Sequence, residues 1–185
     1  AVLQCIYEED FLGFSYGFRP HREPHQALDA LAVAITEKRV NWILDADIEG
    51  FFDNIDREWL MKFLEHRIGD RRIVRLIQKW LNAGIIENTD WSDTGKGTPQ
   101  GAILSPLLAN VYLHYVFDLW LQQWRQRHAT GECYVVRYAD DFVLGFTCEA
   151  DARRVLEWLP QRFSAHGLTI HPEKTRLVRF RPRPQ

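Results

Sequence analysis

Two aspartates, Asp140 and Asp141, stand side by side between two runs of β-forming apolar residues in the segment VVRYADDFVLGF. Aspartate is favoured in turns, so the pair could simply close a hairpin. A turn needs only one aspartate, however, and a second carboxylate fixed nearby costs roughly 4 kcal/mol of repulsion at ~4 Å and an effective dielectric of 20. A divalent cation held by both carboxylates would offset this repulsion, so the pair indicates a metal site.

A third carboxylate has a similar setting in the segment LDADIEGFFD, where Asp47 comes near the end of another apolar run. Three carboxylates brought together from two strand ends suit two Mg²⁺ ions about 3.5–4 Å apart, of which one activates the attacking oxygen and the other stabilises the leaving oxygen. Asp45 and Asp53 compete with Asp47 for this role, and spacing alone does not choose among them. The pattern therefore predicts two-metal phosphoryl transfer.

The composition is that of one well-cored globular domain. The chain has 185 residues, of which 46% are hydrophobic and 26% are charged. Its net charge of −2 does not by itself indicate a nucleic-acid partner. The last stretch, KTRLVRFRPRPQ, carries five cations and no acid, and it is either a phosphate contact or a solvated end.

The cysteines and the apolar segments bound the compartment. Cys5, Cys133 and Cys148 show no spacing typical of a disulfide framework or a zinc site, so we expect a reducing, cytoplasmic setting. The first residues show no signal-peptide pattern. The longest apolar stretch, residues 103–121, is interrupted by polar residues and a proline, and it predicts a buried helix of a soluble protein with no membrane partner.

Hydrophobic periodicity and capping residues predict the strands and helices that position the acids. Helices are predicted over 25–38, from Asp56 to about Gly69, from Asp70 to about Gly84, over a long stretch after residue 104, and over 149–167. Pro160 should kink or divide the last of these. Short strands are predicted at 40–48, 132–138, 142–146 and 171–180, with a further hairpin over 85–98. The fold class is α+β, an antiparallel sheet with helices packed on one face.

The helical stripes predict which apolar side chains are buried. We expect Leu28, Trp80 and Leu119 to lie on the core faces of their helices, because each has apolar neighbours at helical spacing.

Four motifs occur in the order found in reverse transcriptases: DADIEGFFDNID, GTPQGAILSPLLANVYLH, YADD between strands, and GLTIHPEKT. Together they resemble most the group II intron-encoded reverse transcriptases, also called maturases, and SYGFRPHREPHQAL resembles the segment before the first catalytic strand of that family. The resemblance spans essentially the whole chain. It implies a polymerase palm-like domain over 41–185, preceded by part of the fingers over 1–40, with the N-terminal fingers and the thumb absent.

The resemblance also implies roles for the acids. Asp47 matches the acid of the first catalytic motif, and Asp140 and Asp141 match the pair of the second. In the family, the equivalents of Asp47 and Asp140 bind the metals most directly and that of Asp141 assists. The expected cofactor is a pair of Mg²⁺ ions, for which Mn²⁺ is a possible substitute.

Four further residues match nucleotide-binding positions of the family. Phe52 matches the bulky residue that blocks a ribose 2′-hydroxyl, and its neighbour Phe51 should face away. Gln100, in the loop GTPQGAILSP, should lie against the incoming nucleotide and template, and Lys174 should lie near the triphosphate. Arg19 should meet nucleotide or nucleic-acid phosphates, as should Arg22, because guanidinium groups suit phosphate.

The function implied is RNA-directed DNA polymerisation, with RNA template, DNA primer and deoxynucleoside triphosphates as partners and the parent intron RNA as a further one. Phe52 and the YADD tetrapeptide disfavour an RNA-templated RNA polymerase. The alternative is a noncatalytic RNA-binding scaffold that retains polymerase motifs. Without a thumb, the 185-residue chain alone is expected to be weakly active or inactive. The oligomeric state is left open.

Overall fold

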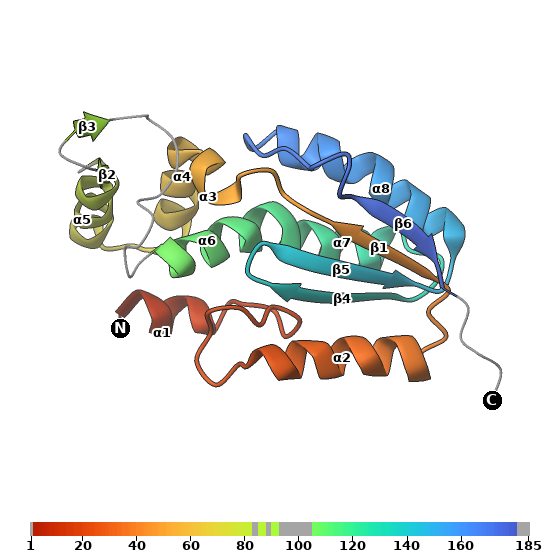
Figure 1. Cartoon of the computed structure of the whole chain (residues 1–185). Helices are drawn as coiled ribbons and strands as arrows, with labels where there is room; N and C mark the ends of the chain where they lie inside the picture. The colour runs from red at the N-terminus through yellow and green to blue at the C-terminus, as the bar shows by residue number, and fades with distance from the viewer. Residues whose placement is uncertain (1, 83–84, 88–89, 93–104, 181–185) are drawn as a thin grey trace.

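The computed structural model describes residues 2–82, 85–87, 90–92 and 105–180 (Figure 1). The chain begins with helix α1 (Val2–Glu8), passes through an irregular segment and continues in helix α2 (Pro24–Glu37). Helix α2 begins with a capping box that was not predicted from the sequence. The side chains of Glu23 and Gln26 each accept a hydrogen bond from the backbone N–H group of the other residue. Residues 14–16 run beside the sheet, where Ser15 forms a bridge with Arg137.

A four-stranded antiparallel sheet forms the centre of the molecule (Figure 1). Its strand order is β4-β5-β1-β6, and the strands are β1 (Trp42–Ala46), β4 (Cys133–Tyr138), β5 (Asp141–Phe146) and β6 (Arg176–Arg179). The register pairs Leu44 with Leu144 and Val135 with Leu144, so alternate residues of three strands share one apolar face. The opposite face carries the exposed Asp45 and Arg176.

Helices cover the apolar face. They are α6 (Ser105–Leu113), the π-helical turn η1 (His114–Asp118), α7 (Leu119–Arg127) and α8 (Glu149–Ser164). Phe117, Phe142 and Phe163 pack ring against ring between these helices and the sheet. The predicted α+β architecture with a helix-covered sheet is confirmed, and these buried aromatic rings form part of its hydrophobic core.

Three helices connect β1 to the rest of the fold: α3 (Phe51–Asn54), α4 (Arg57–Arg67) and α5 (Arg71–Asn82). Asp56 caps α4 as predicted, because its carboxylate accepts from the N–H groups of Glu58 and Trp59. Asp70 accepts from the N–H of Arg72 at the start of α5. A hairpin of β2 (Ile85–Glu87) and β3 (Asp90–Ser92) follows, within the predicted 85–98 region.

Several burial predictions are wrong. Leu28, Trp80 and Leu119 are 60%, 46% and 40% exposed. For Leu119 the cause is the π-helical turn, which adds a residue to one turn and rotates the following side chains off the predicted stripe.

Pro160 does not divide α8, which runs through it as one helix. Among the described residues, no helix is long and apolar enough to cross a membrane.

Candidate active site

The three predicted acids meet at one end of the sheet. The β1–β5 register ends with Ala46 opposite Phe142, and its next step sets Asp47 opposite Asp141. Tyr138 pairs with Asp141 across the hairpin, so Ala139 and Asp140 form the tight turn between β4 and β5. Asp47 and Asp141 are more than 90 residues apart in the sequence, and the pairing of β1 with β5 brings them together.

The electrostatics indicate that these carboxylates lie near one another. The pKa of Asp141 is raised, first by partial burial and then by the negative charges of Asp140, Asp47 and Asp45. The cation of Lys174 opposes this shift. Asp45 contributes because it lies on the same face of the sheet, two residue pairs away, opposite Val143. Four acids and one lysine therefore share this end of the open face.

Lys174 contacts the first of these acids directly. Its Nζ lies 2.9 Å from Oδ2 of Asp47. The segment before β6 brings it there by running beside the end of β1: Ile48 forms a bridge with Ile170, and the N–H of His171 donates to the carbonyl of Asp47 at 2.8 Å. Lys174 is 64% exposed and Asp47 is 32% exposed, so the pair is open to solvent.

The donor chemistry fits Mg²⁺ in an open site. Carboxylate oxygens are the ligands this ion prefers, and it commonly takes one or two of them together with water and substrate phosphates. In the described part of the chain no three histidine, cysteine, aspartate or glutamate side chains have the geometry to hold a metal ion. Asp47, Asp140 and Asp141 could supply carboxylate ligands, but among the described residues they do not by themselves form a three-ligand site.

Phe52 lies a short distance along the chain from Asp47. Gly50 adopts a left-handed conformation (φ 50°) that turns the chain from β1 into the single turn of α3. Phe51 is buried in the core, and Phe52 is half-buried with its ring centre 5.3 Å from that of Phe51. That Phe51 faces away from the nucleotide stays a prediction. Gln100 lies outside the described residues.

Comparison with known proteins now identifies the family. Residues 1–183 match the family model described as reverse transcriptase (RNA-dependent DNA polymerase). The chain belongs to the reverse transcriptase family. The group II intron-encoded protein LtrA of Lactococcus lactis subsp. cremoris is 45% identical over 121 residues, which cover 65% of this chain and 20% of that protein. Protein YkfC of Escherichia coli (strain K12) is 33% identical over 174 residues, covering 77% of this chain and 45% of that protein.

These matches confirm the predicted group II intron type, and this reverse transcriptase chain spans only a fifth of the length of LtrA. Among solved structures, a telomerase from Candida albicans in complex with a TWJ fragment of telomeric RNA has a TM-score of 0.74 at 14% identity, covering 96% of this chain and 33% of that one. An apo telomerase from Candida tropicalis, truncated from the C-terminal domain, has a TM-score of 0.70 at 12% identity, covering 98% of this chain and 39% of that one. At such identities the likeness establishes the fold.

Arg19 is not brought to the acids of this reverse transcriptase. Only 8% of the residue is exposed, and its guanidinium donates to the carboxylate of Glu8 and to the carbonyls of Leu12 and Ser15, the latter two at 2.8 Å. Arg22 donates to the carbonyl of Gly13 at 3.3 Å. These contacts hold the segment between α1 and α2 in shape, and they lend no support to the predicted phosphate contact of Arg19.

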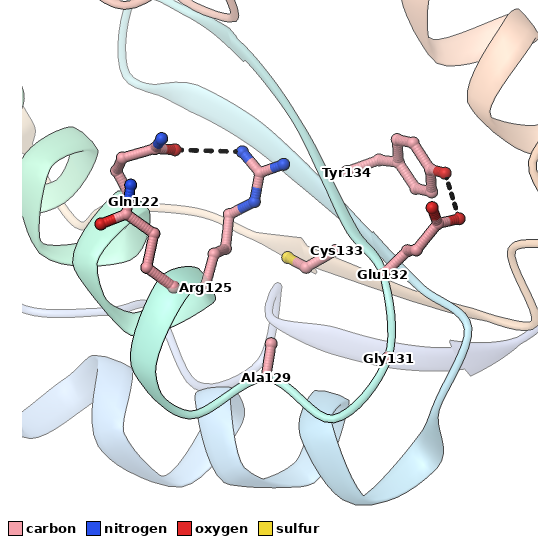
Figure 2. A pocket seen from close by; sticks show the side chains of 8 residues that line it. Gln122, Arg125, Ala129, Gly131, Glu132, Cys133 and Tyr134 are labelled. Carbon is pink, nitrogen blue, oxygen red and sulfur yellow. Dashed lines mark hydrogen bonds between the residues drawn. The ribbon is translucent and has the colours of Figure 1, made fainter.

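A separate hollow of about 280 Å³ lies at the start of β4, at the far end of that strand from Asp140 (Figure 2). Arg125 and Gln122 are hydrogen-bonded on one side of it, and Tyr134 and Glu132 on the other (Figure 2). No residue of the predicted site lines this hollow.

Sequence reasoning missed Arg137 and Asp118, which form a fully buried ion pair behind the Asp140 turn. The signal for Arg137 was its position: in the strand CYVVRY it alternates with Cys133 and Val135, so a charged side chain had to point to the apolar face. Asp118 carried a similar signal, as the acid inside an apolar helical run.

Proposed function

We propose that this chain is the catalytic palm of a reverse transcriptase, which adds deoxynucleotides to the 3′-end of a primer along an RNA template. The observation that carries the proposal is the β1–β5 register, because it brings Asp47 to Asp141 with Asp140 in the adjoining turn. A chain that kept only the fold would not need aspartates at the ends of both strands. The family match over residues 1–183 supports the same reaction.

In this proposal Asp47, Asp140 and Asp141 hold two Mg²⁺ ions, or Mn²⁺ in their place. Bound there, the metal supplies Lewis acidity for the phosphoryl group and lowers the pKa of the attacking hydroxyl. Lys174 lies against Asp47 and provides a positive charge where the triphosphate of the nucleotide would arrive. When a triphosphate is present, its oxygens and Asp47 compete for this ammonium group.

Two residues are proposed to select the nucleotide. The half-buried ring of Phe52 would exclude a ribose 2′-hydroxyl because it leaves no room for the extra oxygen. Gln100 would contact the nucleotide and template through its amide, which carries both a donor and an acceptor. The intron RNA is proposed as a further partner, on the strength of the relatives' description as group II intron-encoded. A reducing, cytoplasmic location stays a prediction from the three free thiols.

The test is metal-dependent extension of a DNA primer on an RNA template, run on the 185-residue chain and on the full-length protein that contains it. Asp140→Asn should lower the extension rate by roughly 10³-fold or more, because it removes a charge from the metal site while preserving shape. The matched control is Asp29→Asn on the exposed side of α2, which should extend normally.

Thermal unfolding should show both variants folded. Unchanged extension by Asp140→Asn would remove the metal assignment. If the unmodified full-length protein binds RNA tightly yet never extends a primer, the noncatalytic scaffold replaces the polymerase as the function.

A further inference from the structure

Arg137 is a buried charge whose hydrogen-bonding capacity is completely used. Its side chain is 0% exposed, and a guanidinium carries five N–H donors. Nε donates to Oδ1 of Asp118 at 2.8 Å, and Nη2 donates to Oδ2 of Asp118 at 2.6 Å and to Oγ of Ser15 at 2.7 Å. Nη1 donates to Oδ1 of Asn110 at 2.9 Å and to the carbonyl of Ala139 at 2.8 Å. All five donors therefore have an acceptor.

These five bonds join Arg137 to four segments of the chain. Ser15 belongs to the segment before α2, Asn110 to α6, Asp118 to the π-helical turn η1, and Ala139 to the β4–β5 turn. A π-helical turn is rare and is often found where a helix must present a side chain to a functional site. Here it presents the carboxylate of Asp118 to Arg137.

The acceptor that matters most is the carbonyl of Ala139. This residue has φ 58°, a left-handed conformation that L-residues other than glycine rarely adopt. Such a conformation persists where the surroundings determine it. Ala139 directly precedes Asp140, so the peptide whose oxygen Arg137 holds is the peptide that aims Asp140.

A second contact presses on the same turn. The carbonyl of Gly17 accepts a hydrogen bond of 2.6 Å from Nδ2 of Asn110, which holds the Gly17 backbone against Ala139. A Cβ at position 17 would lie 2.2 Å from the backbone nitrogen of Ala139, so only glycine fits there. The turn is thus held by the guanidinium on one side and by the Gly17 backbone on another.

We propose that Arg137 is a positioning residue of the polymerase site: through the Ala139 carbonyl it fixes the direction in which Asp140 and Asp141 present their carboxylates. This rests on the proposed function for its consequence in catalysis, although the restraint on the turn does not. A buried ion pair adds little to stability compared with well-packed apolar side chains of similar volume. Stability alone therefore does not account for Arg137 and Asp118.

The first arm of the test measures the turn without any catalysis. Replacing both charges in the double variant Arg137→Met, Asp118→Leu removes the ion pair while keeping apolar volume. It also leaves the Ala139 carbonyl, Oδ1 of Asn110 and Oγ of Ser15 without their donor, so the variant should fold but melt at a lower temperature than the unmodified protein. Amide hydrogen exchange over residues 138–142 should become at least about tenfold faster, while exchange in α8 stays unchanged. If the double variant fails to fold, the same amide hydrogen exchange measurement is made on Arg137→Lys, because a lysine can pair with Asp118 but cannot supply five donors.

The second arm measures primer extension by the full-length protein. The double variant should lose about a hundredfold in kcat with the nucleotide KM changed less than about threefold, since displaced carboxylates harm the reaction more than ground-state binding. The control is Ser15→Ala, which removes one bond to Arg137 and leaves the bond to Ala139 intact; it should change neither exchange at the turn nor kcat.

The two arms separate the possible failures. If the double variant folds and its amide hydrogen exchange over residues 138–142 is unchanged, Arg137 does not position the turn, whatever the activity of the variant. Faster exchange with unmodified kcat overturns the catalytic consequence. If even the unmodified protein extends no primer, the proposed function fails, and the exchange arm still decides whether Arg137 holds the turn.

Discussion

Neutralising Asp141 should make the protein more stable. In the absence of metal its carboxylate lies near those of Asp140, Asp47 and Asp45, whose negative charges oppose its ionisation, and the cation of Lys174 favours it. Asp141→Asn removes the repulsion and preserves the shape of the side chain. A replacement at a site chosen for chemistry commonly gains stability in this way, because the site was not optimised for folding.

The expected gain is modest. Like charges directly opposite each other on neighbouring strands destabilise a sheet by about 0.2–1 kcal/mol, and the register sets Asp47 opposite Asp141. The other two aspartates add to this repulsion and Lys174 subtracts from it, while the exposure of Asp141 lets solvent screen every pair. A net gain of about 1 kcal/mol at pH 7 corresponds to a rise of about 2–4 °C in the melting temperature of a domain of this size.

The gain should depend on pH in one direction. The pKa of Asp141 is raised, so the folded protein holds this proton more tightly than the unfolded chain does. The stability that it contributes is fully present below the ordinary aspartate pKa of about 3.9 and is lost as the pH rises through the raised value. The advantage of Asp141→Asn should therefore be near zero at about pH 3 and complete by about pH 7.

Thermal unfolding of the 185-residue chain in a chelator, at a series of pH values, measures this directly. Asp45→Asn should give a smaller rise, because Asp45 lies two residue pairs away, and Asp29→Asn on α2 should give none. Adding Mg²⁺ should raise the melting temperature of the unmodified protein more than that of Asp141→Asn. A lower melting temperature for Asp141→Asn at pH 7, or a difference that does not change with pH, would refute the mutual repulsion of these carboxylates.

Three further outcomes follow from the same structure. Lys174→Met should tighten Mg²⁺ binding in the absence of nucleotide by up to about fivefold, the worth of a solvent-screened pair with Asp47; calorimetric titration showing weaker binding would contradict this. Phe52→Ala should raise ribonucleotide incorporation, and if incorporation stays at the unmodified level the 2′-hydroxyl is excluded elsewhere. Asp56→Ala should lower the free energy of unfolding in urea by about 1 kcal/mol, since its carboxylate caps α4; no change would show that water replaces the cap.

The Lys174 pair also bears on how the site changes when substrate arrives. Lys174 pairs with Asp47, and the described residues contain no closed three-ligand site. A triphosphate would draw the ammonium group away and would bring its own oxygens as ligands. Binding of the nucleotide should therefore increase the affinity for the metal, and binding of the metal should increase the affinity for the nucleotide. The Lys174→Met prediction has the same basis, because this variant also removes the ammonium group from Asp47.

Local features were predictable because they depend on neighbours in the sequence. Asp56 and Asp70 cap the helices that they were expected to cap, since a capping carboxylate contacts N–H groups two or three residues away. The strands on either side of Asp140 and Asp141 follow from alternating apolar residues and a tight turn. The position of Asp47 at a strand end followed in the same way, and the motif order indicated the family.

Exposure on the helices was less predictable. Trp80 and Leu28 lie on stripes that are apolar by periodicity, yet each is largely exposed. A helix with two apolar sides buries the one that a partner element covers, and the sequence of that helix does not name the partner. The displacement of Leu119 came from a single π-helical turn that no periodicity predicts.

By itself the sequence determined which side chains could do the chemistry, where the strands end and which family the chain resembles. Only the tertiary structure decided how these parts meet: that Asp47 lies opposite Asp141, that Lys174 contacts Asp47 and that Arg137 holds the turn before Asp140. The physical reason is that strand register and the pairing of buried charges are set by contacts between segments far apart in the sequence, such as Ser15 and Arg137, which are 122 residues apart. Such pairings are selected by the burial of the whole core, and no window of neighbouring residues contains that information.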